Sequence, residues 1–299
     1  MSGGGGPTPV TEALLRARPL PRHEEGEDKD GRGRVLVVAG SLEVPGAALL
    51  AGIAALRAGA GRLRIATCRG IAPHLGLAVP EALVLGLDET LAGGISAEEA
   101  GRLAEGAGRC DALLLGPGMM DPEAVSLLTR RLLEEAEPGP GFVVDAGALK
   151  GLMDCRAAVR RHAGRVVVTP HAGEMAGLLG IPREAVEADP LAAALRVAAE
   201  LGAVVAMKGG CTRIVSPWGE AWSCSQGNVG LATSGSGDTL AGIIAGLLAR
   251  GASPEDATIW GVYLHGEAGN RLARSRGPVG FLARELLAEI PGIMAGLAA

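Results

Sequence analysis

Residues 227–251 read GNVGLATSGSGDTLAGIIAGLLARG, and this stretch decides the fold of the chain. Its first half is rich in glycine, serine and threonine, whereas its second half has the spacing of an amphipathic helix. Apolar residues recur there at i, i+3, i+4, i+7 and i+8: Leu240, Ile243, Ile244, Leu247 and Leu248. The other side carries only small residues, which allow close packing: Ala241, Gly242, Ala245 and Gly246. We therefore predict a helix that begins near Gly237 and Asp238 and ends before Gly251.

The start of this predicted helix is suited to bind an anion. Free backbone N–H groups at a helix N-terminus, with the helix dipole behind them, attract negative charge. Gly235 and Gly237, on either side of Ser236, let the backbone curl closely around phosphate oxygens. Asp238 would repel an anion, so its presence asks for an explanation. Two remain open: a helix cap, or a catalytic base aimed at a substrate hydroxyl beside the phosphates.

The bulk composition excludes several classes of protein. Of the 299 residues 48% are hydrophobic and 2% aromatic, and the net charge of −5 gives no sign of a nucleic-acid surface. The five cysteines are scattered, which predicts reduced thiols in a cytoplasmic protein and argues against structural zinc. No apolar run is long enough to span a membrane, and the first residues lack the pattern of a signal peptide.

Short apolar runs alternate with helical patterns along the chain. The runs predict strands over residues 35–39, 63–67, 82–87, 111–116, 142–145, 166–169 and 203–207. Right-handed crossovers would then give a three-layer α/β/α sandwich around a mainly parallel sheet. We expect a flexible N-terminal segment over 1–33, with one short helical pattern over 11–17, and a single domain over 34–299.

The last third of the chain adds a hairpin and two helices to this plan. RIVS and EAWSC, joined by residues 217–220, predict two antiparallel strands. Residues 254–273 and 279–297 have helical patterns, and His265 within the first of them is expected to lie in the core.

Several predicted strands end in residues that could face a ligand, because ligands bind outside the carboxyl ends of parallel strands. Asp145 and Lys208 each end a strand, and a lysine followed by two glycines suits a phosphate contact. Gly118 closes a Gly-Pro-Gly turn, which is weak evidence because turns need glycine anyway. His171 follows another strand, where a lone histidine has either a structural or a binding role.

Three motifs carry a resemblance to a known family. GSGD opening an apolar helix resembles the nucleotide site of ribokinase-like proteins. TPHAGE at 169–174, KGGCT at 208–212 and GNVGLATSGSGD occur in the order found in ADP/ATP-dependent NAD(P)H-hydrate dehydratases. The chain resembles this family over roughly residues 33–298. The family usually carries a His-Lys-Gly-like element before its first strand, where this chain has Asp-Lys-Asp-Gly around Lys29.

The resemblance implies a role for each motif. It places the nucleotide against Lys208, Gly209, Gly210, Cys211, Thr212, Gly235, Ser236 and Gly237. It places the substrate against Ala47, Gly118, His171 and Asp238, with Asp238 as the catalytic base. Ala47 has an equally good explanation in close packing of a helix on the sheet.

The implied reaction is a dehydration that restores NADH or NADPH from their C6-hydrated forms, NADHX and NADPHX, at the expense of ADP or ATP. No cluster of His, Cys or carboxylate residues predicts a metal cage, so Mg²⁺ is expected to arrive with the nucleotide. Two other functions stay open: a small-molecule kinase of the hydroxymethylpyrimidine or hydroxyethylthiazole type, and a non-catalytic nucleotide sensor. Relatives also suggest a homotetramer, and we expect it in the cytoplasm. Members of the family are often fused to an NAD(P)HX epimerase. Because only about thirty residues precede the first predicted strand, we expect this chain to act beside a separate epimerase.

Overall fold

A ten-stranded sheet forms the centre of the protein. The computed structural model describes residues 6–22, 26, 29–162 and 164–298. The strands lie in the order β1-β10-β9-β8-β7-β6-β5-β2-β3-β4. Their bounds are Thr8–Pro9 (β1), Arg34–Val38 (β2), Arg62–Cys68 (β3), Ala82–Leu87 (β4), Ala112–Leu115 (β5), Gly141–Val144 (β6), Val166–Val168 (β7), Val204–Met207 (β8), Thr212–Val215 (β9) and Ala221–Cys224 (β10). Among the strands of the described residues, β9 alone runs antiparallel to its neighbours, so the predicted mainly parallel sheet and the β9–β10 hairpin are confirmed.

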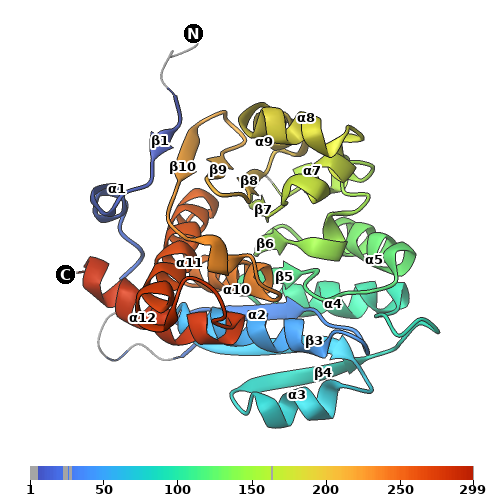
Figure 1. Cartoon of the computed structure of the whole chain (residues 1–299). Helices are drawn as coiled ribbons and strands as arrows, with labels where there is room; N and C mark the ends of the chain where they lie inside the picture. Colours follow the sequence, from blue (N-terminus) through green and yellow to red (C-terminus); the bar gives the residue numbers. More distant parts are fainter. Residues whose placement is uncertain (1–5, 23–25, 27–28, 163, 299) are drawn as a thin grey trace.

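Helices cover both faces of this sheet (Figure 1). One face holds α2 (Pro45–Arg57), α3 (Ala72–Ala78), α10 (Ser236–Ala249), α11 (Pro254–Arg276) and α12 (Ala283–Ala298). The other holds α4 (Ala100–Ala107), α5 (Pro122–Glu135), α6 (Arg156–Arg160), α7 (Ala172–Leu179), α8 (Arg183–Ala188) and α9 (Pro190–Leu201). This arrangement follows from right-handed crossovers as the chain first moves outward from β2 to β4 and then returns through β5 to β8. The expected three-layer α/β/α sandwich is therefore confirmed.

Helix α10 lies at the centre of its layer and begins at Ser236, one residue before the predicted start. Its small residues face α2 across a very short gap. A Cβ atom at Gly242 would lie 2.3 Å from the carbonyl oxygen of Ala51, and one at Gly246 would lie 2.4 Å from that of Ala55. The predicted close packing is confirmed, and α2 is the partner.

The N-terminal segment differs from the expectation of flexibility over 1–33. Thr8 and Pro9 pair in parallel with Trp222 and Ser223 of β10, and Leu15 of helix α1 (Glu12–Ala17) is fully buried. The indole nitrogen of Trp260 donates a hydrogen bond of 2.7 Å to the carbonyl of Arg18. Figure 1 shows this blue segment beside β10 and the red helix α12. The flexible segment is therefore a wrong prediction for residues 8–18; its strand partner lies far along the chain, where local composition gives no signal.

In the described part of the chain, no helix is both long enough and apolar enough to cross a membrane.

Candidate nucleotide and substrate site

The start of α10 is held against α2 and α11 at the carboxyl edge of the parallel strands. Gly235 is the N-cap, with φ of +84°, and a Cβ there would lie 2.4 Å from Leu50 of α2. The positive φ favours glycine, and a Cβ there would also force the Leu50 side chain to move. Ser236 is buried, and its hydroxyl lies 2.9 Å from Nε2 of His265. The N–H of Ser236 donates to the carbonyl of Thr233 at 3.3 Å, whereas the described residues offer the N–H groups of Gly237 and Asp238 no acceptor.

His265 belongs to this site, although the sequence predicts it in the core. Burial lowers its pKa to about 4, so the imidazole is neutral at physiological pH. The helical pattern of 254–273 gave no sign of the contact, because Ser236 lies on a different helix.

Lys208 forms the charged centre of the site. Its ammonium lies 2.9 Å from Oδ1 of Asp145 and 3.6 Å from Oε2 of Glu174. Asp145 is almost fully buried and also accepts a hydrogen bond of 2.6 Å from the hydroxyl of Thr169. Burial alone would lower the pKa of Lys208, but the two carboxylates outweigh it and the net shift is upward, so the ammonium stays charged.

The Lys208 ammonium also reaches the start of α10. The position of a Cβ on Gly237 is 3.5 Å from Nζ of Lys208, so the positive charge lies directly beside the helix N-terminus. An ammonium, a helix dipole and free N–H groups at one point form a site for phosphate. The sequence identifies both Lys208 and the helix N-terminus as candidates for phosphate binding. The contact of Lys208 with Glu174 can be seen only in the three-dimensional structure.

Asp238 lies in the first turn of α10, half-buried, and within the described residues its carboxylate makes no hydrogen bond or ion pair. Gly235 occupies the N-cap position, which gives the cap explanation for Asp238 no support. The pKa of Asp238 is raised to about 6, mainly by burial and further by the charges of Asp145 and Glu174, with Lys208 acting in the opposite direction. A carboxylate with a raised pKa and a free oxygen can accept a proton.

A cavity of about 780 Å³ opens beside these groups. Seven residues predicted from the sequence to contact ligands line it: His171, Lys208, Gly209, Gly210, Thr212, Ser236 and Gly237. The remaining wall comes largely from the loop over 226–233 and from α11. Cys211 and Gly235 are sequence neighbours of lining residues but do not line the cavity themselves. The Cys211 sulfur accepts a hydrogen bond of 3.3 Å from Ser225.

Ala47 and Gly118 form a second group, close to each other and outside this cavity. Gly118 has φ of +64°, and a Cβ there would lie 2.5 Å from that of Ala47. Ala47 is buried on α2, one turn before Leu50, which contacts the start of α10 at Gly235. The structure therefore supports the packing explanation of Ala47.

His171 has a structural role, and its predicted role in substrate binding stays a prediction. It is the N-cap of α7, and its Nδ1 accepts hydrogen bonds from the N–H groups of Gly173 (3.0 Å) and Glu174 (3.2 Å). Glu174 accepts in return from the N–H of His171, which completes a capping box. The Nε2 atom remains for a ligand, 3.5 Å from Oε1 of Glu174.

Lys29 lies far from this site. It is exposed, and its carbonyl oxygen lies against Gly61, directly before β3, at the amino edge of the sheet. Asp28, beside it, lies outside the described residues.

The fold and the anion site together define a ribokinase-like α/β protein. Residues 35–292 match the family model described as NAD(P)H-hydrate dehydratase. The chain belongs to this family.

Individual relatives agree with the family model. An ADP-dependent (S)-NAD(P)H-hydrate dehydratase of Xanthomonas campestris is 49% identical over 286 residues, which cover 95% of each chain. The crystal structure of the ADP/ATP-dependent enzyme from Bacillus subtilis, co-crystallised with ATP/Mg²⁺, superposes with a TM-score of 0.81 at 30% identity over 97% of this chain and 98% of that one. A bifunctional NAD(P)H-hydrate repair enzyme of Moorella thermoacetica is 41% identical, and the chain spans 54% of its length.

Proposed function

We propose that the protein dehydrates the S form of NADHX and NADPHX to NADH and NADPH, with ADP or ATP consumed. The observation that carries this proposal is the start of α10, where Lys208 and the helix N-terminus form a phosphate site within reach of the unpaired Asp238 carboxylate. Membership of the dehydratase family supplies the substrate. Direct loss of hydroxide is slow, since hydroxide is a poor leaving group, so phosphorylation of the hydroxyl makes departure feasible.

In this reaction the C6 hydroxyl attacks the terminal phosphorus of the nucleotide, and Asp238 accepts the hydroxyl proton. The bond to the leaving phosphate of the nucleotide breaks, so ADP yields AMP. The lone pair of the ring nitrogen then expels inorganic phosphate from C6, and loss of a proton from C5 restores the dihydropyridine. Lys208 and the N–H groups of Gly235 and Gly237 stabilise charge on the transferred phosphoryl group.

The residues present suit a metal that arrives with the nucleotide. Among the described residues there is no group of three or more His, Cys, Asp or Glu side chains that could hold an ion. Asp145 and Glu174 are hard oxygen donors beside the phosphate site, but Lys208 already contacts both. Mg²⁺ would therefore be held mainly by phosphates and water, and it would neutralise charge on the phosphates during transfer.

Incubation with NADHX and ADP tests the proposal, because only restored NADH absorbs at 340 nm. We expect absorbance to recover with ADP or ATP and to stay flat when nucleotide is omitted. A kinase would release a stable phosphorylated alcohol and restore no absorbance, and a sensor would consume no nucleotide. Absence of recovery with both nucleotides would contradict the proposal.

We further propose that the protein acts in the cytoplasm as a homotetramer beside an epimerase that interconverts the two forms of the hydrate. The bifunctional relatives support the partnership with an epimerase. They are longer than this chain, and their names assign them two repair functions. Sedimentation analysis would test the tetramer, and activity on mixed hydrate forms with added epimerase would test the partnership.

A further inference from the structure

One wall of the cavity is a loop that makes few hydrogen bonds to the described helices. Residues Gln226 to Ala232 follow β10 and lead to the start of α10, and most of them line the cavity. Their backbone hydrogen bonds are local, such as those from Leu231 to Asn228 and from Ala232 to Val229. A wall of this kind needs support from outside if it is to keep one shape.

Helix α11 supplies a flat surface for this loop. A Cβ on Gly266 would lie 2.6 Å from the carbonyl oxygen of Gln226, and one on Gly269 would lie 2.7 Å from the side chain of Leu231. Both glycines therefore let the loop lie directly on the helix. Asn270 follows on the same face, four residues after Gly266.

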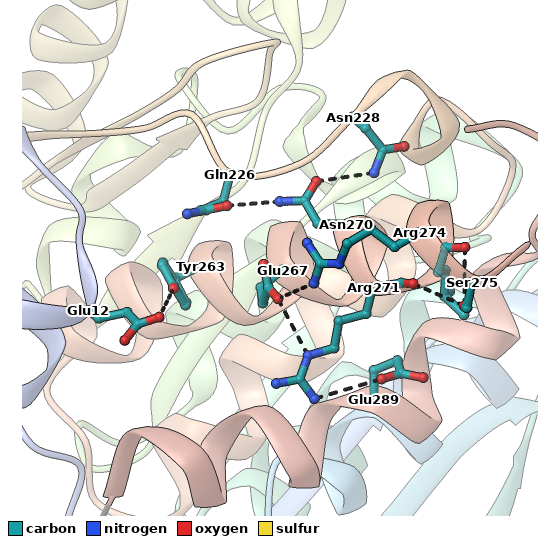
Figure 2. Close-up of polar contacts among 11 residues, drawn as sticks. Glu12, Gln226, Asn228, Tyr263, Glu267, Asn270, Arg271, Arg274, Ser275 and Glu289 are labelled. Carbon is teal, nitrogen blue, oxygen red and sulfur yellow. Dashed lines mark hydrogen bonds and ion pairs between the residues drawn. The ribbon is translucent and has the colours of Figure 1, made fainter. Parts of the chain in front are cut away.

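The carboxamide of Asn270 joins both ends of this contact (Figure 2). Its nitrogen donates to Oε1 of Gln226 at 2.8 Å, and its oxygen accepts from Nδ2 of Asn228 at 3.3 Å. The oxygen of Asn228 in turn accepts from the N–H of Gly230 at 2.9 Å. Within the part of the chain that the structure describes, the two bonds of Asn270 are the hydrogen bonds that join residues 226–232 to an α-helix.

We infer that Asn270 is a positioning residue for the nucleotide. Its side chain lies outside the cavity lining, whereas Gln226 and Asn228 belong to the lining, so it acts through them. By holding both amides it fixes the wall formed by residues 226–232 before the nucleotide arrives, which lowers the entropy cost of binding. His265, five residues earlier on α11, holds Ser236 on the neighbouring wall, so one helix sets the spacing of both. The inference rests on the proposed nucleotide site.

Calorimetric titration of ADP into Asn270→Leu, Asn270→Asp and wild-type protein tests this inference. Leucine has a similar volume but cannot join the two amides, so we expect the Kd for ADP to rise about tenfold, as for the loss of one to two hydrogen bonds. Aspartate can accept from Asn228 and, after rotation of the Gln226 amide, from Gln226, so its Kd should stay within about threefold of wild type. The KM for ADP should follow the Kd, while kcat at saturating ADP should change less than about twofold.

Ser275→Ala is the matched control, because Ser275 is exposed on α11 and its hydroxyl donates, within the described residues, to carbonyls of its own helix alone. It should bind ADP as the wild type does. Should Asn270→Leu fail to fold by circular dichroism, Asn270→Ala takes its place, since alanine favours helix. If the wild type binds ADP and the folded variant binds it with the same Kd, the role of Asn270 is overturned and the proposed function still stands. Failure of the wild type to bind ADP or ATP would overturn the proposed function as well.

Discussion

Asp238 carries its charge where charge is unfavourable. Burial and the charges of Asp145 and Glu174 together raise its pKa to about 6, against the opposing charge of Lys208. A base must be deprotonated to accept the hydroxyl proton, so activity should depend on this ionisation. We expect kcat/KM to be level between pH 7 and 8 and to fall about tenfold per pH unit below about 6. Initial rates at 340 nm across this range would check it; a level profile down to pH 5 would contradict it.

Asp238→Asn separates the roles of base and cap. Asparagine caps helices as well as aspartate does, but it has no lone pair basic enough to take the proton. Turnover of NADHX should fall by ~10²–10⁴, while ADP still binds.

The stability of this variant provides its control. Folding raises the pKa of Asp238, so the ionised carboxylate costs stability at neutral pH, and that cost decreases as pH falls from about 6 toward the ordinary value of 3.8. The variant lacks the charge and should therefore melt at the wild-type temperature or above it at pH 7.5. Turnover within a few-fold of wild type would contradict the role of Asp238 as the base, whatever the melting temperature, because asparagine would preserve a cap.

His171→Asn tests the substrate role of His171 without loss of the cap on α7. Asparagine can accept the hydrogen bonds that His171 Nδ1 accepts from Gly173 and Glu174, whereas alanine would remove them. Loss of Nε2 should raise the KM for NADHX about three- to tenfold, as for one hydrogen bond, and leave the Kd for ADP nearly unchanged. A titration in which ADP binding weakens instead would assign His171, which lines the same cavity as Lys208, to the nucleotide.

At the scale of elements, the contact between α10 and α2 sets the position of the helix N-terminus. Gly246→Ala should destabilise the protein by about 1–3 kcal/mol, because the new Cβ would clash with the carbonyl of Ala55. Gly177→Ala in α7 is the matched control: its Cβ would meet nothing within 4 Å, so it should stabilise by up to about 1 kcal/mol. Urea unfolding of both variants measures these changes. Equal effects of the two substitutions would contradict the close packing.

Local patterns predict the elements that bury apolar side chains and fail where a partner lies elsewhere in the chain. The strand over 82–87 is predicted to the residue, because a continuous apolar run needs no knowledge of its neighbours. Strand β1 has only two residues and depends on pairing with Trp222 and Ser223, so its sequence carries no strand signal.

At the scale of the whole molecule, the sheet topology brings distant motifs to one edge. Asp145, His171 and Lys208 follow β6, β7 and β8, which are neighbours in the sheet, so the sequence order of these strands predicts their proximity. The contacts of His265 with Ser236 and of Asn270 with the 226–232 loop were not predictable in this way. They depend on how α11 packs against α10 and the loop, and the helical pattern of α11 by itself carries no signal for this packing.

In the proposed function, nucleotide consumption and dehydration are one coupled reaction. NADH, AMP and inorganic phosphate should be quantified together after NADHX is incubated with ADP and Mg²⁺. We expect one AMP and one phosphate for each NADH formed. AMP that accumulates with a phosphorylated hydrate and without NADH, or NADH that forms without AMP, would contradict it.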